Sequence, residues 1–241
     1  MNKTEGGTFD TSDQASSMST QAAINKYCSY FEGQLERIRS MENTFYQKIL
    51  LVVMFDTWAR ARYPNVKNNK NRFVSLIREC ADWPESERVS LPQLSLSQQG
   101  SFGTSKLAKE VGRRFSQWQY GRINRLNMDP LPNELEPFVI TDEERQLIKR
   151  SQHAVLFYTY RNHLVHEFRM PGYGMEISDE SSTPYYHGMT TVGGHETWEL
   201  VYPIGFFNNM ANCLLCNLRI HLVTNGINPY SLYKFGSVWN P

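Results

Sequence analysis

The sequence predicts a mainly α-helical protein, built as a helical bundle with a small β-hairpin inserted in it. Two long segments carry this prediction. Residues 20–63 contain no proline and repeat their apolar side chains with helical spacing, and residues 203–225 form a second apolar run that ends before Gly226. Hydrophobic residues make up 40% of the 241 residues, which excludes a disordered or low-complexity chain.

The N-terminal region is expected to begin with a tail. Residues 1–19 have few apolar groups to bury, so we expect a disordered polar tail, followed by a single helical domain over residues 20–241. The first helical stripe follows the i, i+3, i+4, i+7 pattern at Ile24, Tyr27, Cys28 and Phe31. The segment is expected to be one long helix, or two stacked helices with a break near residues 40–43, and Pro64 should end it.

The central third is richer in helix-breaking residues. A short amphipathic helix is expected over residues 73–81, and a further helix over residues 106–120. Residues 83–103 combine Ser, Gln and Gly with two prolines, which predicts an extended loop. Three prolines predict another loop over residues 128–140.

The C-terminal third has clearer signals. Thr141 and Glu144 match a capping box, so we expect one helix from Asp142 to about Phe168, before Pro171-Gly172. Residues 185–202 alternate around a Gly-Gly pair, which predicts a β-hairpin.

Charge and cysteine usage limit the class of protein. The chain has 25 basic and 24 acidic residues, so any basic surface must be local. The longest apolar run, residues 49–55, is far below the roughly 20 residues that span a bilayer, so we expect no membrane partner. Four cysteines suit a reducing compartment, and we expect a cytoplasmic protein. Cys213 and Cys216 have metal-ligand spacing but no second pair, and their neighbours are typical of a core helix, so we expect neither a metal nor a cofactor.

One cluster of polar residues lies in the expected helix of residues 142–168. Arg161 falls inside its apolar stripe, where a guanidinium needs an anionic partner. Asn162 and His166 are four residues apart and share a face beside it. An arginine can clamp a phosphate, a histidine can move a proton, and the 2′-hydroxyl of RNA is an internal nucleophile. These three residues are therefore compatible with a metal-independent endoribonuclease.

An arginine, a polar residue and then a histidine after four intervening positions, late in a helix, resembles the signature of the HEPN superfamily. The resemblance implies a HEPN-like bundle that cleaves RNA to 2′,3′-cyclic phosphate ends. Arg161 would hold the scissile phosphate, His166 would be the general acid–base, and Asn162 would orient them. Two copies of the motif would meet across a homodimer in one composite site.

The superfamily includes RNA-cleaving toxins, CRISPR-associated effectors and antiviral nucleases. The resemblance therefore also implies phage defence or toxin activity, with an antitoxin or effector as partner. Some toxin members carry a tyrosine two positions after the histidine, which their antitoxin nucleotidylates. This chain has Phe168 there, which argues against such regulation.

A second interpretation of the motif is structural. Arg161 and His166 would then be a polar pair inside the bundle, with an acidic partner from Glu36, Glu42 or Asp56. The chain would be a non-catalytic HEPN-like module that binds RNA, a nucleotide or a protein.

Residues 104–127 carry six basic residues against Glu110, interleaved with Phe115, Trp118 and Tyr120. Such a pattern can follow an RNA backbone and stack bases, and it predicts RNA binding by Lys106, Lys109, Arg113, Arg114, Arg122 and Arg125. The alternative is a solvated helix face with its own core aromatics. A second basic cluster consists of Arg60, Arg62, Lys67, Lys70 and Arg72.

Overall fold

The structure is a computed structural model, and it describes residues 18–97, 104–172, 174, 176, 182–190, 193–194 and 196–232. The tail predicted for residues 1–19 lies outside the described residues, apart from its last two positions. The described chain is mainly helical with one small antiparallel sheet, as predicted.

The helices are α1 Thr20–Arg39, α2 Thr44–Arg62, α3 Asn69–Cys80, α4 Leu91–Ser97, α5 Lys106–Phe115, α6 Pro132–Leu135, α7 Asp142–Arg150, α8 His153–His166 and α9 Ile204–Thr224. The strands are β1 Ile123–Arg125, β2 Tyr185–Thr190 and β3 Glu196–Val201. Single turns of 3₁₀-helix cover Pro84–Glu87, Leu126–Met128, Glu136–Phe138 and Pro229–Leu232.

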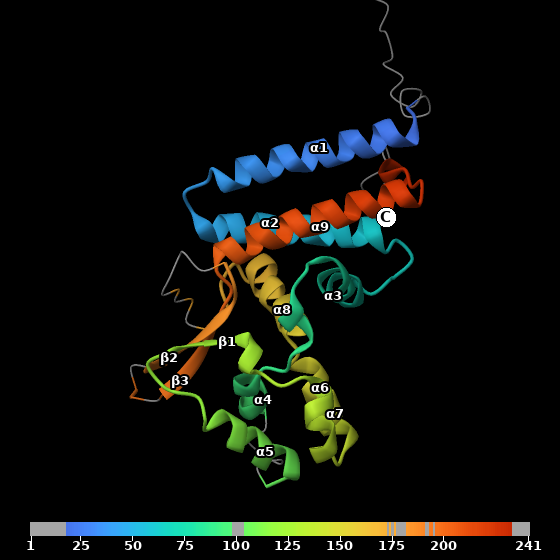
Figure 1. The fold of residues 1–241 in the computed structure, drawn as a ribbon. Coiled ribbons are helices and arrows are strands. Elements are labelled where there is room, and N and C mark those ends of the chain that lie inside the picture. The colour runs from blue at the N-terminus through green and yellow to red at the C-terminus, as the bar shows by residue number, and fades with distance from the viewer. Residues whose placement is uncertain are drawn as a thin grey trace, which may run out of the picture.

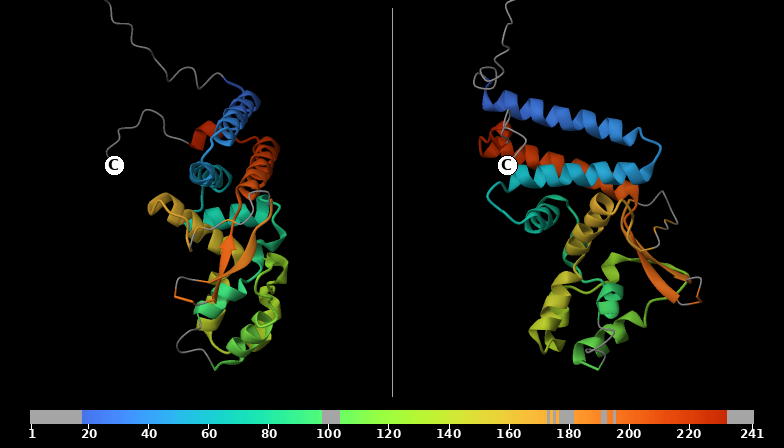
Figure 2. Two further views of the ribbon diagram at one scale, coloured as in Figure 1. Left: turned by 90° about the vertical axis from the view of Figure 1, so that its left-hand side faces the viewer. Right: turned by 180° about the vertical axis from the view of Figure 1, so that it is seen from behind.

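The long helices α1, α2 and α9 lie side by side at one end of the molecule (Figure 1). Helices α3 and α8 pack beneath α2, helices α4 to α7 form the opposite end, and the sheet lies along one side between the two ends (Figures 1 and 2). Fully buried aromatic side chains join these layers: Phe55 and Trp58 of α2, Phe73 of α3, Phe157 of α8 and Phe207 of α9. Each such side chain stabilises the fold by roughly 1.5–3 kcal/mol through burial alone.

The break predicted between the first two helices is confirmed. Helix α1 ends at Arg39, and Asn43 begins α2 as its N-cap, because its side-chain oxygen accepts a hydrogen bond from the backbone N–H of Phe45 at 3.0 Å.

The end of α9 is also as predicted. Gly226 has φ +60°, its N–H donates to the carbonyl of Val223 at 3.2 Å, and the next N–H, of Ile227, donates to Leu222 at 2.9 Å. These two bonds form a Schellman cap, which requires a left-handed residue at this position.

Gly226→Ala should therefore lower the free energy of unfolding by about 1 kcal/mol, because alanine is strained at a positive φ. For a chain of this length we expect the melting temperature to fall by about 2–4 °C. Gly33 is the control, because it lies in the middle of α1 and open space surrounds the position that a methyl group would take. Gly33→Ala should raise stability by a similar amount. Thermal unfolding of both variants checks this. Changes in melting temperature of the same sign for the two variants would contradict it.

The hairpin predicted over residues 185–202 is confirmed as β2 and β3, with Tyr185 opposite Val201 and Thr190 opposite Glu196. The sequence did not predict β1, which adds a third strand by pairing Ile123 with His187. Tyr185 and Tyr186 are fully buried, so both faces of β2 are covered.

Both loop predictions were wrong in part, because several prolines lie in the first turn of a helix. Pro132 begins α6, and Pro84 begins a 3₁₀ turn. The missing N–H of proline costs nothing at a first helical position. Residues 83–97 consequently hold a 3₁₀ turn and α4 rather than an extended loop, and residues 98–103 lie outside the described residues.

The helix predicted from Asp142 to Phe168 is two helices. Its capping box is confirmed, since the Thr141 hydroxyl accepts from the N–H of Glu144 at 3.2 Å and Glu144 accepts in return from the N–H of Thr141 at 3.2 Å. The helix then ends at Arg150 and α8 starts at His153. Tertiary hydrogen bonds replace helical ones here: Ser90 N–H donates to Ser151 at 2.9 Å, and His153 N–H donates to Arg88 at 3.0 Å.

Candidate functional site

The three motif residues of α8 meet around one guanidinium group. Nη1 of Arg161 lies 2.9 Å from Oδ1 of Asn162 and 3.0 Å from Nε2 of His166. Arg161 and Asn162 are half-buried, and His166, the last residue of α8, is exposed. The structure therefore brings together the three residues that the sequence singled out.

The other side of the guanidinium is held by α2. Nε of Arg161 donates to Oδ2 of Asp56 at 2.7 Å, and Nη2 donates to the same oxygen. The Arg161 side chain is 14% exposed and that of Asp56 is 25% exposed. Burial raises the pKa of Asp56 above its ordinary value, although the charges of Arg161 and Arg72 act against this rise. Asp56 thus fixes the guanidinium with its third nitrogen, Nη1, turned toward His166.

Of the three acidic partners that the sequence allowed, Asp56 is the one in contact. The sequence did contain a sign that Asp56 is this partner, because Asp56 is the only acidic residue of α2 and directly follows its apolar run. Such a carboxylate needs a cation nearby.

The contact also assigns a role to the imidazole. A guanidinium has only donors, so Nε2 of His166 must accept this hydrogen bond and carry the lone pair. When a ligand replaces the histidine as the acceptor for Arg161, this lone pair can take a proton from a hydroxyl group. Its exposed position leaves it open to a substrate.

A hollow of about 240 Å³ lies beside Arg161 and Asp56. Arg60 of α2 and Arg72 of α3 also line it. Two members of the second basic cluster therefore flank the motif, which gives the site a positive surface on this side. The sequence did not link them to Arg161, because α2, α3 and α8 are separate segments.

Comparisons of the chain with family models, with curated proteins and with solved structures give no match. The resemblance to the HEPN superfamily thus stays a prediction, and the geometry around Arg161 carries the functional argument.

Of the basic residues predicted to bind RNA, the four on α5 lie at the end of the molecule opposite α2 (Figures 1 and 2), while Arg122 precedes β1 and Arg125 ends it. Three of them are engaged within the chain: Arg113 and Arg114 donate to Glu110, and Arg125 donates to Thr183. The structure does not bring these residues to Arg161. RNA binding by Lys106, Lys109, Arg113, Arg114, Arg122 and Arg125 stays a prediction.

The aromatic residues of this segment differ in exposure. Trp118 is buried against Tyr186 and Trp198, and Phe115 packs on Trp118, with ring centroids 5.3 Å apart. Tyr120, 40% exposed, is the member of the three that a base could reach. Phe115 and Trp118 therefore pack in the core, as the alternative interpretation of this segment predicted.

Hydrogen bonds from Arg113 and Arg114 lower the pKa of Glu110 to about 2. Glu110→Gln should lower the free energy of unfolding by about 1 kcal/mol at pH 7, because the charged hydrogen bonds weaken. A carboxyl group whose pKa is lower in the folded state stabilises that state at pH values above its unfolded pKa of about 4.3. This stabilisation is lost as the pH falls toward 2. Denaturant titrations at pH 7 and pH 2.5 should show that the difference in free energy of unfolding between wild type and variant is smaller at pH 2.5. A difference that does not change with pH would contradict the role given to Glu110. The same difference for Glu36→Gln, at an exposed residue, would contradict it as well.

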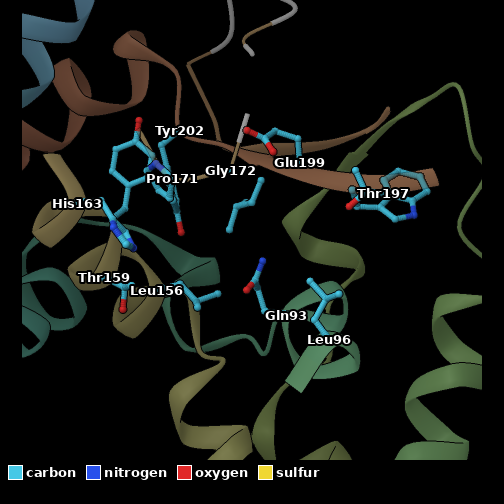
Figure 3. Close-up of a pocket in the computed structure, with 13 residues that line it drawn as sticks. Gln93, Leu96, Leu156, Thr159, His163, Pro171, Gly172, Thr197, Glu199 and Tyr202 are labelled. Carbon is cyan, nitrogen blue, oxygen red and sulfur yellow. The ribbon is translucent and has the colours of Figure 1, made fainter. Parts of the chain in front are cut away.

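A separate pocket of about 320 Å³ lies on another face of α8, between α4, α8 and β3 (Figure 3). His163 and Thr159 border it from α8, and Glu199 borders it from β3. Glu199 is 6% exposed and accepts a hydrogen bond from the N–H of Gly174 at 3.0 Å. Among the described residues, the buried hydroxyl of Tyr202 has no hydrogen-bond partner there. Neither Arg161 nor His166 lines this pocket, and sequence patterns gave no sign of it, since its walls come from distant segments.

The cysteines of α9 lie at the edge of the core. Leu214, Leu215 and Leu218 are buried as predicted, whereas Cys213 is half-buried and Cys216 is exposed.

Within the ranges that the structure describes, no group of three or more His, Cys, Asp or Glu side chains is arranged to hold a metal ion. In the same part of the chain, no helix has both the length and the apolar character that crossing a bilayer requires.

Proposed function

We propose that this chain is a HEPN-type endoribonuclease that cleaves RNA without a metal ion, by attack of the 2′-hydroxyl on the adjacent phosphate. The observation that carries the proposal is the arrangement of Arg161, whose Nη1 faces His166 while Asp56 holds Nε and Nη2. A fixed cation and an accepting imidazole side by side are what this reaction needs.

In the proposed reaction, the substrate phosphate takes over the hydrogen bond that Nη1 of Arg161 makes to His166, and the lone pair of Nε2 freed in this way takes the proton of the 2′-hydroxyl. The 2′-oxygen then forms a bond to phosphorus, the bond from phosphorus to the 5′-oxygen breaks, and the protonated histidine of a second copy delivers a proton to the departing 5′-oxygen. The products are a 2′,3′-cyclic phosphate and a 5′-hydroxyl. A general base of this kind contributes roughly 10²–10⁴-fold to the rate.

Arg161 would stabilise the negative charge that builds up on the phosphate oxygens. Its Nη1 is the donor on the exposed side, next to His166, and Asn162 lies 2.9 Å from the same nitrogen. Asp56 would act as a positioning residue, because it prevents the guanidinium from rotating away.

A homodimer fits this chemistry. The attacking and leaving oxygens lie on opposite sides of the phosphorus, so a second histidine, from another copy, is the natural acid. The exposed face of α2 carries Tyr46, Leu50 and Val53 at helical spacing, and the exposed ring of Phe168 packs on Phe45 beside it. An apolar surface next to His166 supports the pairing of two copies.

A second candidate, a non-catalytic HEPN-like module, is favoured by one observation. The ion pair of Arg161 with Asp56 joins α8 to α2, so the motif also stabilises the bundle. The module would bind RNA, a nucleotide or a protein through the same surface. A role in phage defence or as a toxin, with an antitoxin or effector as partner, rests on the resemblance alone.

The test is a cleavage assay with purified protein, end-labelled RNAs and an excess of EDTA. The proposal expects fragments with 2′,3′-cyclic phosphate and 5′-hydroxyl ends, and sedimentation of the active protein as a dimer. Products with 3′-hydroxyl ends, or cleavage that EDTA abolishes, would show a different chemistry. A folded protein that cuts none of the RNAs would favour the non-catalytic module.

A further inference from the structure

A broad groove of about 750 Å³ lies between α3, α7 and α8. Four basic side chains line it: Lys70 and Arg78 from α3, and Lys149 and Arg150 from the last turn of α7. All four residues are exposed. The one acidic residue among the described groove residues is Glu87, which lies 3.8 Å from Arg78.

This groove adjoins the hollow at Arg161. Helix α3 borders both, through Arg72 in the hollow and Lys70 in the groove, and α8 borders both through Arg161 and Val155. Val155 and Arg161 are six positions apart on α8, which corresponds to ~9 Å along the helix. Together, the two cavities are lined by seven basic and two acidic residues, in a chain whose net charge is +1.

We propose that the groove and the hollow form one track that holds the sugar–phosphate backbone of a single RNA strand and leads it to His166. Lysine and arginine side chains in a row neutralise successive phosphates. Asn71, Ser75 and Gln146 add amide and hydroxyl groups, which bind phosphate oxygens and 2′-hydroxyls. The proposal rests on the proposed ribonuclease function, because that function supplies the substrate.

The lining of the track also indicates how it recognises RNA. Among the described residues of the groove, none is aromatic, so it offers no platform on which a base could stack. Binding should therefore depend strongly on salt and weakly on base sequence. Domains that bind double-stranded RNA span ~16 base pairs, whereas this groove has the size of a site for about two or three nucleotides.

The break between α7 and α8 creates this surface. Because α7 ends at Arg150, its two terminal cations border the same groove as α3. A continuous helix over residues 142–168 would not have placed them there.

The test compares two pairs of neutralising substitutions in the full-length protein. Lys149→Gln with Arg150→Gln removes two exposed charges from the track, and Lys26→Gln with Arg37→Gln removes two exposed charges from α1, outside every predicted RNA-binding residue. The probe is a fluorescent single-stranded RNA of 20 nucleotides with 2′-O-methyl groups, which cannot be cleaved. Fluorescence anisotropy gives Kd at several salt concentrations, and thermal unfolding confirms that both variants are folded.

We expect the track variant to raise Kd about 10-fold and to reduce the slope of log K against log salt by about 1.4, or 0.7 for each lost phosphate contact. The α1 variant should change Kd less than 2-fold. With unmodified RNA, the track variant should raise KM and leave kcat unchanged. Lys70→Gln, from the opposite wall, should weaken binding in the same direction.

Equal effects of the two pairs, a larger effect of the α1 pair, or tighter binding of a duplex than of the single strand would overturn the track. A wild type that binds none of the RNA probes would overturn it as well. If the track variant loses binding but the wild type never cleaves, the track stands and the ribonuclease proposal fails. If the wild type cleaves and the track variant matches it in Kd, KM and salt slope, the ribonuclease stands and the track fails.

Discussion

His166→Ala is expected to reduce RNA cleavage by about 10³-fold and to leave the melting temperature within about 2 °C of the wild type. The loss of rate follows from the role of Nε2, which carries the lone pair that would accept the 2′-hydroxyl proton. The unchanged stability follows from position: His166 is exposed at the end of α8, and Arg161 keeps its bonds to Asp56 and Asn162. Cleavage of end-labelled RNA in EDTA and thermal unfolding measure the two effects.

His163→Ala is the matched control. His163 lies three residues earlier on α8, and its Nδ1 contacts Glu167 at 2.9 Å and Arg169 at 3.0 Å instead of Arg161. The proposal expects this variant to cleave RNA within a few-fold of the wild-type rate. If both histidine variants lose activity equally, or if His166→Ala cuts as fast as the wild type, His166 is not the base. If His166→Ala loses activity only because it unfolds, the motif is structural.

The site could be anticipated to the extent that it is local. Arg161, Asn162 and His166 come together because they lie within two turns of one helix, where spacing along the chain fixes spacing in space. The caps at Thr141 and Gly226 were predictable for the same reason, since both depend on hydrogen bonds between near neighbours.

The parts that sequence patterns missed depend on contacts between distant segments. Asp56 reaches Arg161 across 105 positions, and Arg72 approaches from a third helix. The break at Ser151 arises from backbone hydrogen bonds to Arg88 and Ser90, while the local pattern of residues 142–168 favours one helix. The basic track follows from that break, and it could not be inferred from the charge pattern of any single segment.

A buried polar network near this break leads to the second large prediction. Oδ2 of Asp129 accepts from the Tyr186 hydroxyl at 2.8 Å and lies 2.8 Å from Nε2 of His153, while Oδ1 accepts from the N–H of Leu91 at 2.9 Å. Asp129 is 1% exposed and His153 is fully buried. The carboxylate therefore ties the start of α8 to β2 and to the start of α4.

Asp129→Ala should lower the free energy of unfolding by about 3 kcal/mol, because it leaves three buried donors without their acceptor. The melting temperature should fall by about 6–12 °C for a chain of this length. Tyr186→Phe is the matched control. It removes one donor while Asp129 keeps its contacts with His153 and Leu91, so a loss of about 1 kcal/mol is expected. Melting temperatures within 2 °C of the wild type for Asp129→Ala would show that the network does not hold α8.

The two large predictions separate chemistry from stability. A typical domain has 5–15 kcal/mol of stability, so Asp129→Ala should remain mostly folded in the cold. His153 and Arg161 are eight residues apart on one helix, and the Asp56 pair that holds the guanidinium is independent of Asp129. Cleavage by the folded variant at low temperature should therefore stay within a few-fold of the wild type. If Asp129→Ala instead loses cleavage while it is still folded, the network also positions Arg161 and His166, and the reactive geometry depends on the start of α8 as well as on α2.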